Sequence, residues 1–179
     1  MTTSVRSNQL SQVPFDVEFA PGAYNAVNVC LRVQPTEKVC VITDDATVEI
    51  AAAVVAELEK LGAPYRAWIL EELAQRPLID LPREILADLE TSQVSIFAVQ
   101  AQTNELRSRI QMTDVVNRRK IRHAHMVNIN RQIMIEGMRA DFQRVDRLSQ
   151  KVVEMVRKAS KIRALAERNK LSHSLPIAP

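Results

Sequence analysis

Four short runs of apolar and β-branched residues constrain this chain more than any other feature. The runs cover residues 38–43, 65–70, 94–99 and 123–129. The first three have almost no polar alternation, as expected of strands that are covered on both faces, whereas the fourth alternates with polar residues. Between consecutive runs the apolar residues take helical spacing. The sequence therefore predicts an α/β fold, with a mostly parallel sheet of about four strands flanked by helices.

The helices are predicted by apolar spacing together with start and stop signals. Residues 48–61 repeat apolar side chains every three or four positions, and Gly62 follows as a typical helix stop. Pro82 suits the first turn of a helix that runs to Leu89. Three more helices are predicted, from residue 21 to about 35, from 103 or 104 to about 120, and around 131–138.

The chain is predicted to have four parts. They are a flexible lead-in over residues 1–20, an α/β domain over 21–139, a long connector helix over 140–168 and an irregular tail over 169–179. The connector carries a narrow apolar seam with alternating spacings of three and four, which consists of Val145, Leu148, Val152, Met155, Ala159, Ile162 and Ala166. Such a seam is typical of packing against one other helix or a separate surface, and it makes a homo-oligomer through this helix a possible arrangement.

Composition excludes several classes of protein. With only 3 glycines, the chain has no Gly-rich loop that could cradle a phosphate group, so a standard nucleotide site is not expected. Two cysteines, Cys30 and Cys40, cannot make a disulfide framework or a cysteine-rich zinc site. No apolar run approaches the length of a membrane span, and residues 1–10 are too polar for a signal peptide. A cytoplasmic protein without a membrane partner is expected.

Charge is distributed unevenly along the chain. Residues 1–100 carry a balance of −7 and residues 101–179 a balance of +10, within a net charge of +3. The basic run Arg118, Arg119, Lys120 and Arg122 suggests a phosphate or nucleic-acid contact, but cations also favour a helix C-terminus for electrostatic reasons. Because aromatic residues make up only 4% of the chain, no stacking platform for bases is expected. We therefore expect no nucleic-acid partner.

Two histidines form the clearest candidate for a metal site. His123 and His125 lie two apart in a predicted strand, so both should point to one face and their geometry permits a shared ion. A catalytic metal needs at least a third ligand. The remaining histidine, His173, lies in the predicted tail, and no acidic residue occurs between Asp114 and Glu136. Histidines with satisfied hydrogen bonds at a strand end are the favoured interpretation.

Asp44 and Asp45 follow the first predicted strand, at the edge where parallel sheets usually bind ligands. Two adjacent carboxylates could hold a cation or a ribose, but helix capping explains at least one of them without any ligand. Cys40 is expected to be inert core, Cys30 to lie on a helix face, and no serine has the setting of a nucleophile elbow. No residue is therefore assigned a catalytic, cofactor-binding or metal-ligating role.

Two stretches resemble the amino-terminal region of the aminopeptidase T-like leucyl aminopeptidases. The first follows the pattern V-x-P-x-E-x-V, a strand, and T-D-x-x-T-x-x-I-A, at Val33, Pro35, Glu37, Val39, Thr43, Asp44, Thr47, Ile50 and Ala51. The second follows I-x-x-x-I-M-x-E-G-M, at Ile129, Ile133, Met134, Glu136, Gly137 and Met138. The resemblance spans about residues 21–163, and these positions belong to a scaffold and not to a catalytic signature.

The resemblance implies a two-domain metallo-aminopeptidase that removes amino-terminal residues from peptide substrates. In that family a divalent metal such as Zn or Co is bound in the carboxy-terminal domain, which has no counterpart in this sequence. Related iron-dependent ring-cleaving dioxygenases of hydroxypyridines also place their metal in that part. The expected function is thus the non-catalytic amino-terminal domain of an aminopeptidase T-like hydrolase. The alternatives are a stand-alone binding or assembly module and a fragment of a ring-cleaving dioxygenase.

Overall fold

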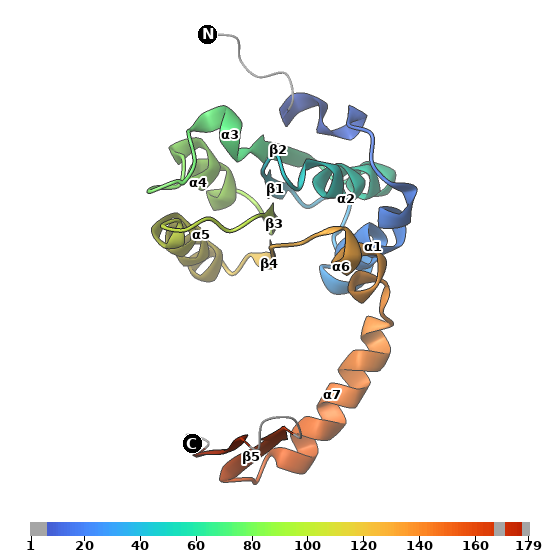
Figure 1. The fold of residues 1–179 in the computed structure, drawn as a ribbon. Helices are drawn as coiled ribbons and strands as arrows, with labels where there is room; N and C mark the ends of the chain where they lie inside the picture. The colour runs from blue at the N-terminus through green and yellow to red at the C-terminus, as the bar shows by residue number, and fades with distance from the viewer. Residues whose placement is uncertain (1–6, 167–170, 177–179) are drawn as a thin grey trace. The chain divides into compact units, whose positions relative to one another are not determined.

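The computed structural model describes residues 7–166 and 171–176, with side chains described as far as Lys161. The described chain divides into two units after Ala140. The first unit contains a sheet covered by helices, and the second contains helix α7 (Phe142–Val156) and a two-stranded hairpin (Figure 1).

The first unit is built on a four-stranded parallel sheet, which confirms the predicted fold class. The strands are β1 (Val39–Thr43), β2 (Tyr65–Ile69), β3 (Val94–Val99) and β4 (Arg122–Val127). They lie in the order β2-β1-β3-β4, and every neighbouring pair is parallel. The two central strands, β1 and β3, are buried at every residue, as their uninterrupted apolar sequences predict.

Helices cover both faces of this sheet (Figure 1). One face carries α1 (Ala20–Tyr24), α2 (Val48–Leu61) and α6 (Arg131–Ile135), and the other carries α3 (Leu70–Leu73), α4 (Arg83–Glu90) and α5 (Leu106–Arg119). Successive residues of β1 alternate between the two cores. Val39 and Val41 join the core under α1 and α2, whereas Cys40 and Ile42 join the core under α4 and α5.

The ends of several elements follow from single residues. Helix α2 has the predicted bounds and ends at Gly62, whose φ of 74° lies in the left-handed region that glycine tolerates best. Strand β4 stops two residues earlier than predicted, where Asn128 also takes a left-handed φ, of 58°. The predicted helix from residue 21 to about 35 is shorter. A π-helical segment at Asn25–Cys30 continues α1, and the helix ends before Arg32, whose φ of 49° lies in the left-handed region.

Gly22 allows helix α1 to approach α6 closely. A Cβ atom at this position would lie 2.8 Å from the carbonyl oxygen of Met134 and 3.0 Å from Cβ of Met138. Both distances are too short for a real side chain, so this contact requires glycine. The contact joins the beginning of the first unit to its end.

The predicted lead-in over residues 1–20 needs correction from residue 7 onward. A 3-10 helix occupies Ser7–Gln12, and a second one occupies Val17–Phe19. Leu10 and Phe19 are 1% and 3% exposed, and both belong to the core under α1 and α2. Polar neighbours mask these two apolar side chains in the sequence, which has no periodicity here. Residues 1–6 lie outside the described part.

The predicted connector helix over 140–168 and irregular tail over 169–179 also differ from the structure. Helix α7 ends at Val156, and an antiparallel hairpin follows, with strands β5 (Lys161–Ala166) and β6 (Leu171–Pro176). Hydrogen bonds between these two strands replace those that a longer helix would form within itself. Pairing between segments therefore outweighs the helical pattern of apolar residues in the sequence. Residues 167–170 and 177–179 of these predicted parts lie outside the described residues.

Within the described ranges, no helix combines the length and the apolar character that crossing a membrane requires.

The burial of Leu10 predicts that the segment before α1 contributes to stability. Replacing Leu10 with Ala should lower the free energy of unfolding by about 2–4 kcal/mol, because it leaves a cavity in the core. The matched control is Gln9→Ala, one residue earlier and exposed, which should change it by less than about 0.5 kcal/mol. Urea denaturation measures both, and equal small effects would mean that this segment does not hold the core.

Candidate functional site

The strand order creates one position in the sheet where a ligand site is expected. From β1 the chain passes to β2 on one side, whereas β3 lies on the other side and leads on to β4. Connections therefore leave the carboxyl ends of β1 and β3 in opposite directions, and parallel sheets tend to bind ligands in the crevice at such a point. Asp44 follows β1 here, and Gln100 follows β3.

Asp44 is fully buried at this edge, and both of its carboxylate oxygens are used. Oδ1 accepts hydrogen bonds from the backbone N–H of Thr47 (3.0 Å) and from Thr47 Oγ1 (2.7 Å). Oδ2 accepts from the backbone N–H of Gln100 (2.7 Å) and from Arg76 Nη1 (2.6 Å). Asp44 thus holds the turn that leads into α2 and ties that turn to β3, whereas the N-cap residue of α2 is Thr47, not Asp44 as the capping interpretation expects.

Arg76 forms ion pairs with three carboxylates at this edge. Its side chain is 4% exposed and contacts Asp44, Glu105 and Glu71, at 2.6, 2.6 and 3.2 Å. Arg76 Nη2 also donates to the carbonyl oxygen of Gln100 (2.6 Å). We call Arg76 with Asp44, Glu71 and Glu105 the Arg76 cluster. It joins the loop after α3 to the ends of β1 and β3 and to the start of α5.

The pKa values of this cluster indicate a stable charged state. Burial by itself would raise the pKa of Glu105, but hydrogen bonds from Arg76 and from the backbone of Leu78 bring it below its usual value. Burial would likewise lower the pKa of Arg76, and its hydrogen bonds to Glu105, Asp44 and Glu71 outweigh that effect and raise it. One cation faces three carboxylates, so the cluster keeps a net negative charge, and its ion pairs join separate elements of the fold.

Sequence reasoning missed Arg76 and Glu105. Arg76 lies in a loop without periodicity, and Glu105 lies just before α5 as its N-cap residue, so neither occupies a motif with recognisable spacing. A lone Arg in a loop 32 residues from its partner Asp44 leaves no signal in one sequence. Only the fold brings these side chains together.

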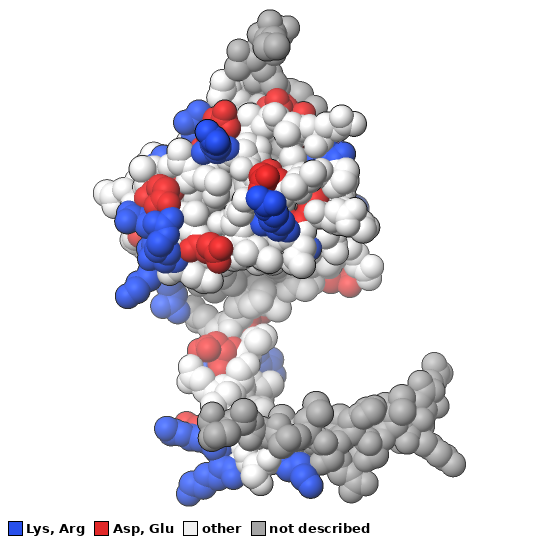
Figure 2. Space-filling model, turned by 90° about the vertical axis from the view of Figure 1, so that its left-hand side faces the viewer, with Lys and Arg blue, Asp and Glu red and all other residues white. Residues whose placement is uncertain are grey.

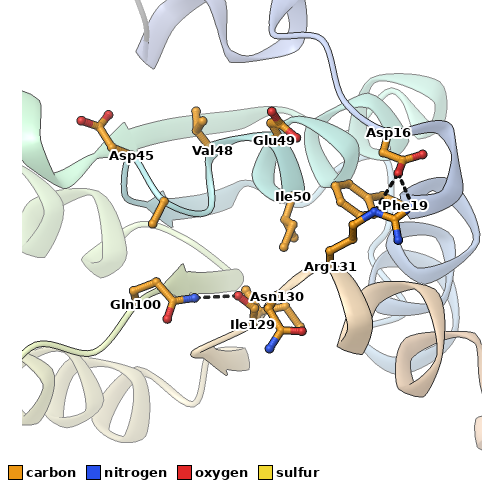
Figure 3. A pocket seen from close by; sticks show the side chains of 11 residues that line it. Asp16, Phe19, Asp45, Val48, Glu49, Ile50, Gln100, Ile129, Asn130 and Arg131 are labelled. Carbon is orange, nitrogen blue, oxygen red and sulfur yellow. Dashed lines mark hydrogen bonds and ion pairs between the residues drawn. The ribbon is translucent and has the colours of Figure 1, made fainter.

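A hollow of about 340 Å³ lies beside the cluster, at the end of the sheet that faces α2 and α6 (Figure 3). Its lining combines the apolar side chains of Phe19, Val48, Ile50 and Ile129 with the polar ones of Asp16, Asp45, Glu49, Gln100, Asn130 and Arg131.

Several of the polar groups around this hollow already have hydrogen-bond partners. Arg131 Nη2 lies 2.8 Å from Asp16 Oδ2, and Gln100 Nε2 donates to the carbonyl oxygen of Ile129 (2.8 Å) (Figure 3). A hydrogen bond from the backbone N–H of Glu18 and another from the side chain of Arg131 lower the pKa of Asp16. Asp45 lines the hollow, close to the end of β1. The hollow can admit a small polar molecule, but the arrangement of its lining residues does not indicate a particular reaction.

His123 and His125 point to the same face of β4, as their spacing predicts. His123 Nε2 lies 3.2 Å from His125 Nδ1, and His123 Nδ1 lies 2.8 Å from Ser95 Oγ. The ring of His125 stacks on Phe97, with centroids 5.6 Å apart. Among the residues with described side chains, no group of three His, Cys, Asp or Glu is placed to hold a metal ion. His173 lies outside those residues.

Both histidines are held neutral at pH 7. Burial, followed by the neighbouring His125, lowers the pKa of His123 to about 4. Burial and the charge of Arg109 lower the pKa of His125. The pair therefore fits the favoured interpretation of hydrogen-bonded histidines at the sheet edge.

The predicted basic run does not form an open cationic patch. Arg118 and Arg119 pair with Glu90 at the end of α4, and Arg122 pairs with Glu37 and donates to the carbonyl oxygen of Leu31. Figure 2 shows acidic side chains beside basic ones over the face that carries α4 and α5. Three of the four cations of the run thus pair with acidic side chains of other elements and connect parts of the fold.

The two cysteines lie apart, and neither favours the thiolate. Cys40 is buried in β1, and burial followed by the charge of Asp88 raises its pKa well above the usual value. Cys30 is exposed at the end of the π-helical segment, but partial burial raises its pKa too. Neither thiol has the lowered pKa of a reactive nucleophile.

Comparisons with known proteins connect this fold to one solved structure in particular. No family model matches the chain, and no curated protein matches it by sequence. Among the solved structures, 2,5-dihydroxypyridine dioxygenase from Pseudomonas putida KT2440 matches with a TM-score of 0.57 at 12% sequence identity. The match covers 96% of this chain and 48% of the dioxygenase, so the chain spans about half of that protein. At this identity the likeness shows the fold alone.

The Arg76 cluster predicts a large loss of stability when its cation is removed. Arg76→Met should lower the free energy of unfolding by about 3–5 kcal/mol, because Asp44 and Glu105 are then left buried without a compensating charge. The control is Arg107→Met, whose ion pair with Asp80 is exposed and should contribute less than about 1 kcal/mol. Similar losses in the two variants, measured by urea denaturation, would contradict a stabilising role for the Arg76 ion pairs.

The lowered pKa of His123 predicts acid sensitivity in a defined window. The unfolded chain takes up a proton near pH 6.5 and the folded chain near pH 4, so the free energy of unfolding falls as the pH falls between these values. Between pH 7 and 4.5 the loss due to His123 should be about 2 kcal/mol. Urea denaturation of the parent and of His123→Asn at both pH values isolates this part. Parallel losses in the two proteins would show that His123 is not the group responsible.

Proposed function

We propose that this chain is a non-catalytic scaffold domain of the kind found in two-domain metal-dependent enzymes, whose reaction centre lies in another domain. One observation carries the proposal, namely that 96% of the chain matches 48% of 2,5-dihydroxypyridine dioxygenase in fold. A chain that has the fold of about half of such an enzyme is expected to contribute a supporting structure and contact surfaces. The reactive groups would come from elsewhere.

The contacts of the described side chains support a structural role for this domain. His123 and His125 do not fit a catalytic metal, because no third ligand accompanies them in the described part of the chain. Asp44 and Glu105 are committed to Arg76, and His123 to Ser95. The groups that sequence reasoning singled out for chemistry therefore already have structural partners.

Two enzyme classes remain as candidates for the two-domain enzyme to which this domain would belong. The fold match supports a ring-cleaving dioxygenase of hydroxypyridines. The scaffold pattern from Val33 to Ala51 supports an aminopeptidase T-like hydrolase acting on peptides, which rests on sequence resemblance alone. We favour the dioxygenase because its support comes from the whole fold and not from short stretches.

The proposal predicts that the purified chain has no turnover of its own. One assay supplies Fe(II), oxygen and 2,5-dihydroxypyridine and follows the loss of ring absorbance. A second supplies Co(II) or Zn(II) and leucyl-p-nitroanilide and follows nitroaniline release. Neither rate should exceed that of the metal ion alone, with circular dichroism confirming that the protein is folded. Turnover in either assay that is absent from the metal blank would overturn the proposal.

The coding DNA downstream of the codon for Pro179 separates the two parent reactions. An open frame, in any phase, that encodes the ligand set of a dioxygenase iron site would support the favoured class. Ligands of a two-metal peptidase site there would favour the hydrolase instead. A downstream region that encodes neither set would leave the two-domain proposal without its second part and would count against it.

A further inference from the structure

Helix α7 presents an apolar seam to solvent. Val145, Leu148, Val152 and Met155 are 48%, 62%, 50% and 83% exposed, and their spacings alternate between three and four residues. Val153 and Val156 are exposed as well and widen the seam on one side. Six exposed large apolar side chains on a helix of 15 residues are far more than scattered surface residues, and they indicate a binding face.

The types of residue along the seam specify the kind of partner. In heptad notation the β-branched Val145 and Val152 occupy a positions, and Leu148 and Met155 occupy d positions. Valine at a with leucine at d favours two parallel strands over higher oligomers. The same four positions therefore fit against their own counterparts in a second, identical helix.

The charges beside the seam decide the direction of pairing. The g positions next to it are basic, at Arg144 and Lys151, and neither makes an ion pair among the described residues. The e positions are Ser149 and Val156, which carry no charge. An antiparallel pair would place basic g residues of one helix opposite basic g residues of the other, which is repulsive. A parallel pair places each basic g residue opposite an uncharged e residue, where its alkyl part can cover the seam.

We propose that α7 associates in parallel with α7 of a second copy of this chain, through Val145, Leu148, Val152 and Met155. The described helix supplies about two heptads, fewer than the three or four that sustain an isolated coiled coil. The dimer is therefore weak and reversible, and its formation depends on protein concentration. This inference uses only residues of α7 and does not depend on the proposed function.

Sedimentation equilibrium tests the association. From about 5 to 500 µM, the average mass of the parent protein should rise from that of the monomer toward twice that value. Leu148→Glu places a charge in the seam and should keep the protein monomeric throughout. Gln143→Glu, an exposed f position on the opposite side of the same helix, should behave like the parent. Circular dichroism confirms that both variants keep their helix content, since glutamate is a good helix former.

Cysteine cross-linking tests the direction of pairing. In a Cys30→Ser background, Met155→Cys should form a disulfide with its own counterpart, because equivalent d positions lie side by side in a parallel pair. A mixture of Val145→Cys and Met155→Cys chains should give the two self-linked dimers and little of the mixed one. A parent protein that stays monomeric at 500 µM, a Leu148→Glu variant that dimerises like the parent, or predominant mixed cross-links would each overturn the proposal.

Discussion

The buried charge of Arg76 is the interaction on which the carboxyl edge of the sheet depends. Asp44 follows a strand whose residues are buried on both faces, and an unpaired carboxylate at that depth would be costly. Arg76 pairs with both Asp44 and Glu105 and also bonds to the backbone at Gln100, so one side chain joins β1, β3 and α5. The same bonds that allow these acids to be buried also occupy their carboxylate oxygens.

This arrangement explains how a fold with a well-known ligand position can lack an evident site. The switch point between β1 and β3 lies where parallel sheets usually bind ligands, and a hollow lies beside it. The edge, however, is held by internal ion pairs and hydrogen bonds that include Asp16 with Arg131.

Much of this fold is predictable from the sequence because strands that are buried on both faces have a recognisable, continuously apolar pattern. Strands such as Val94–Val99 have no polar alternation, and Gly62 marked the end of α2 to the residue. Buried residues in irregular segments leave no such mark, which is why Leu10 was assigned to a flexible lead-in. The hairpin after α7 was missed because its strands pair with each other across a turn, whereas helical spacing is a property of one segment. The geometry of His123 and His125 was predictable from a spacing of two, but the Arg76 cluster needed the strand order.

We propose that the described side chains serve the structure of this domain and hold no metal ion of their own. Equilibrium dialysis of the purified chain against micromolar Zn(II), Co(II) or, without oxygen, Fe(II), followed by mass spectrometry of the metals, tests it most directly. The account predicts well under one bound ion per chain, with no change in His123→Asn. One full equivalent that remains after dialysis into metal-free buffer, and that is lost in His123→Asn, would contradict it.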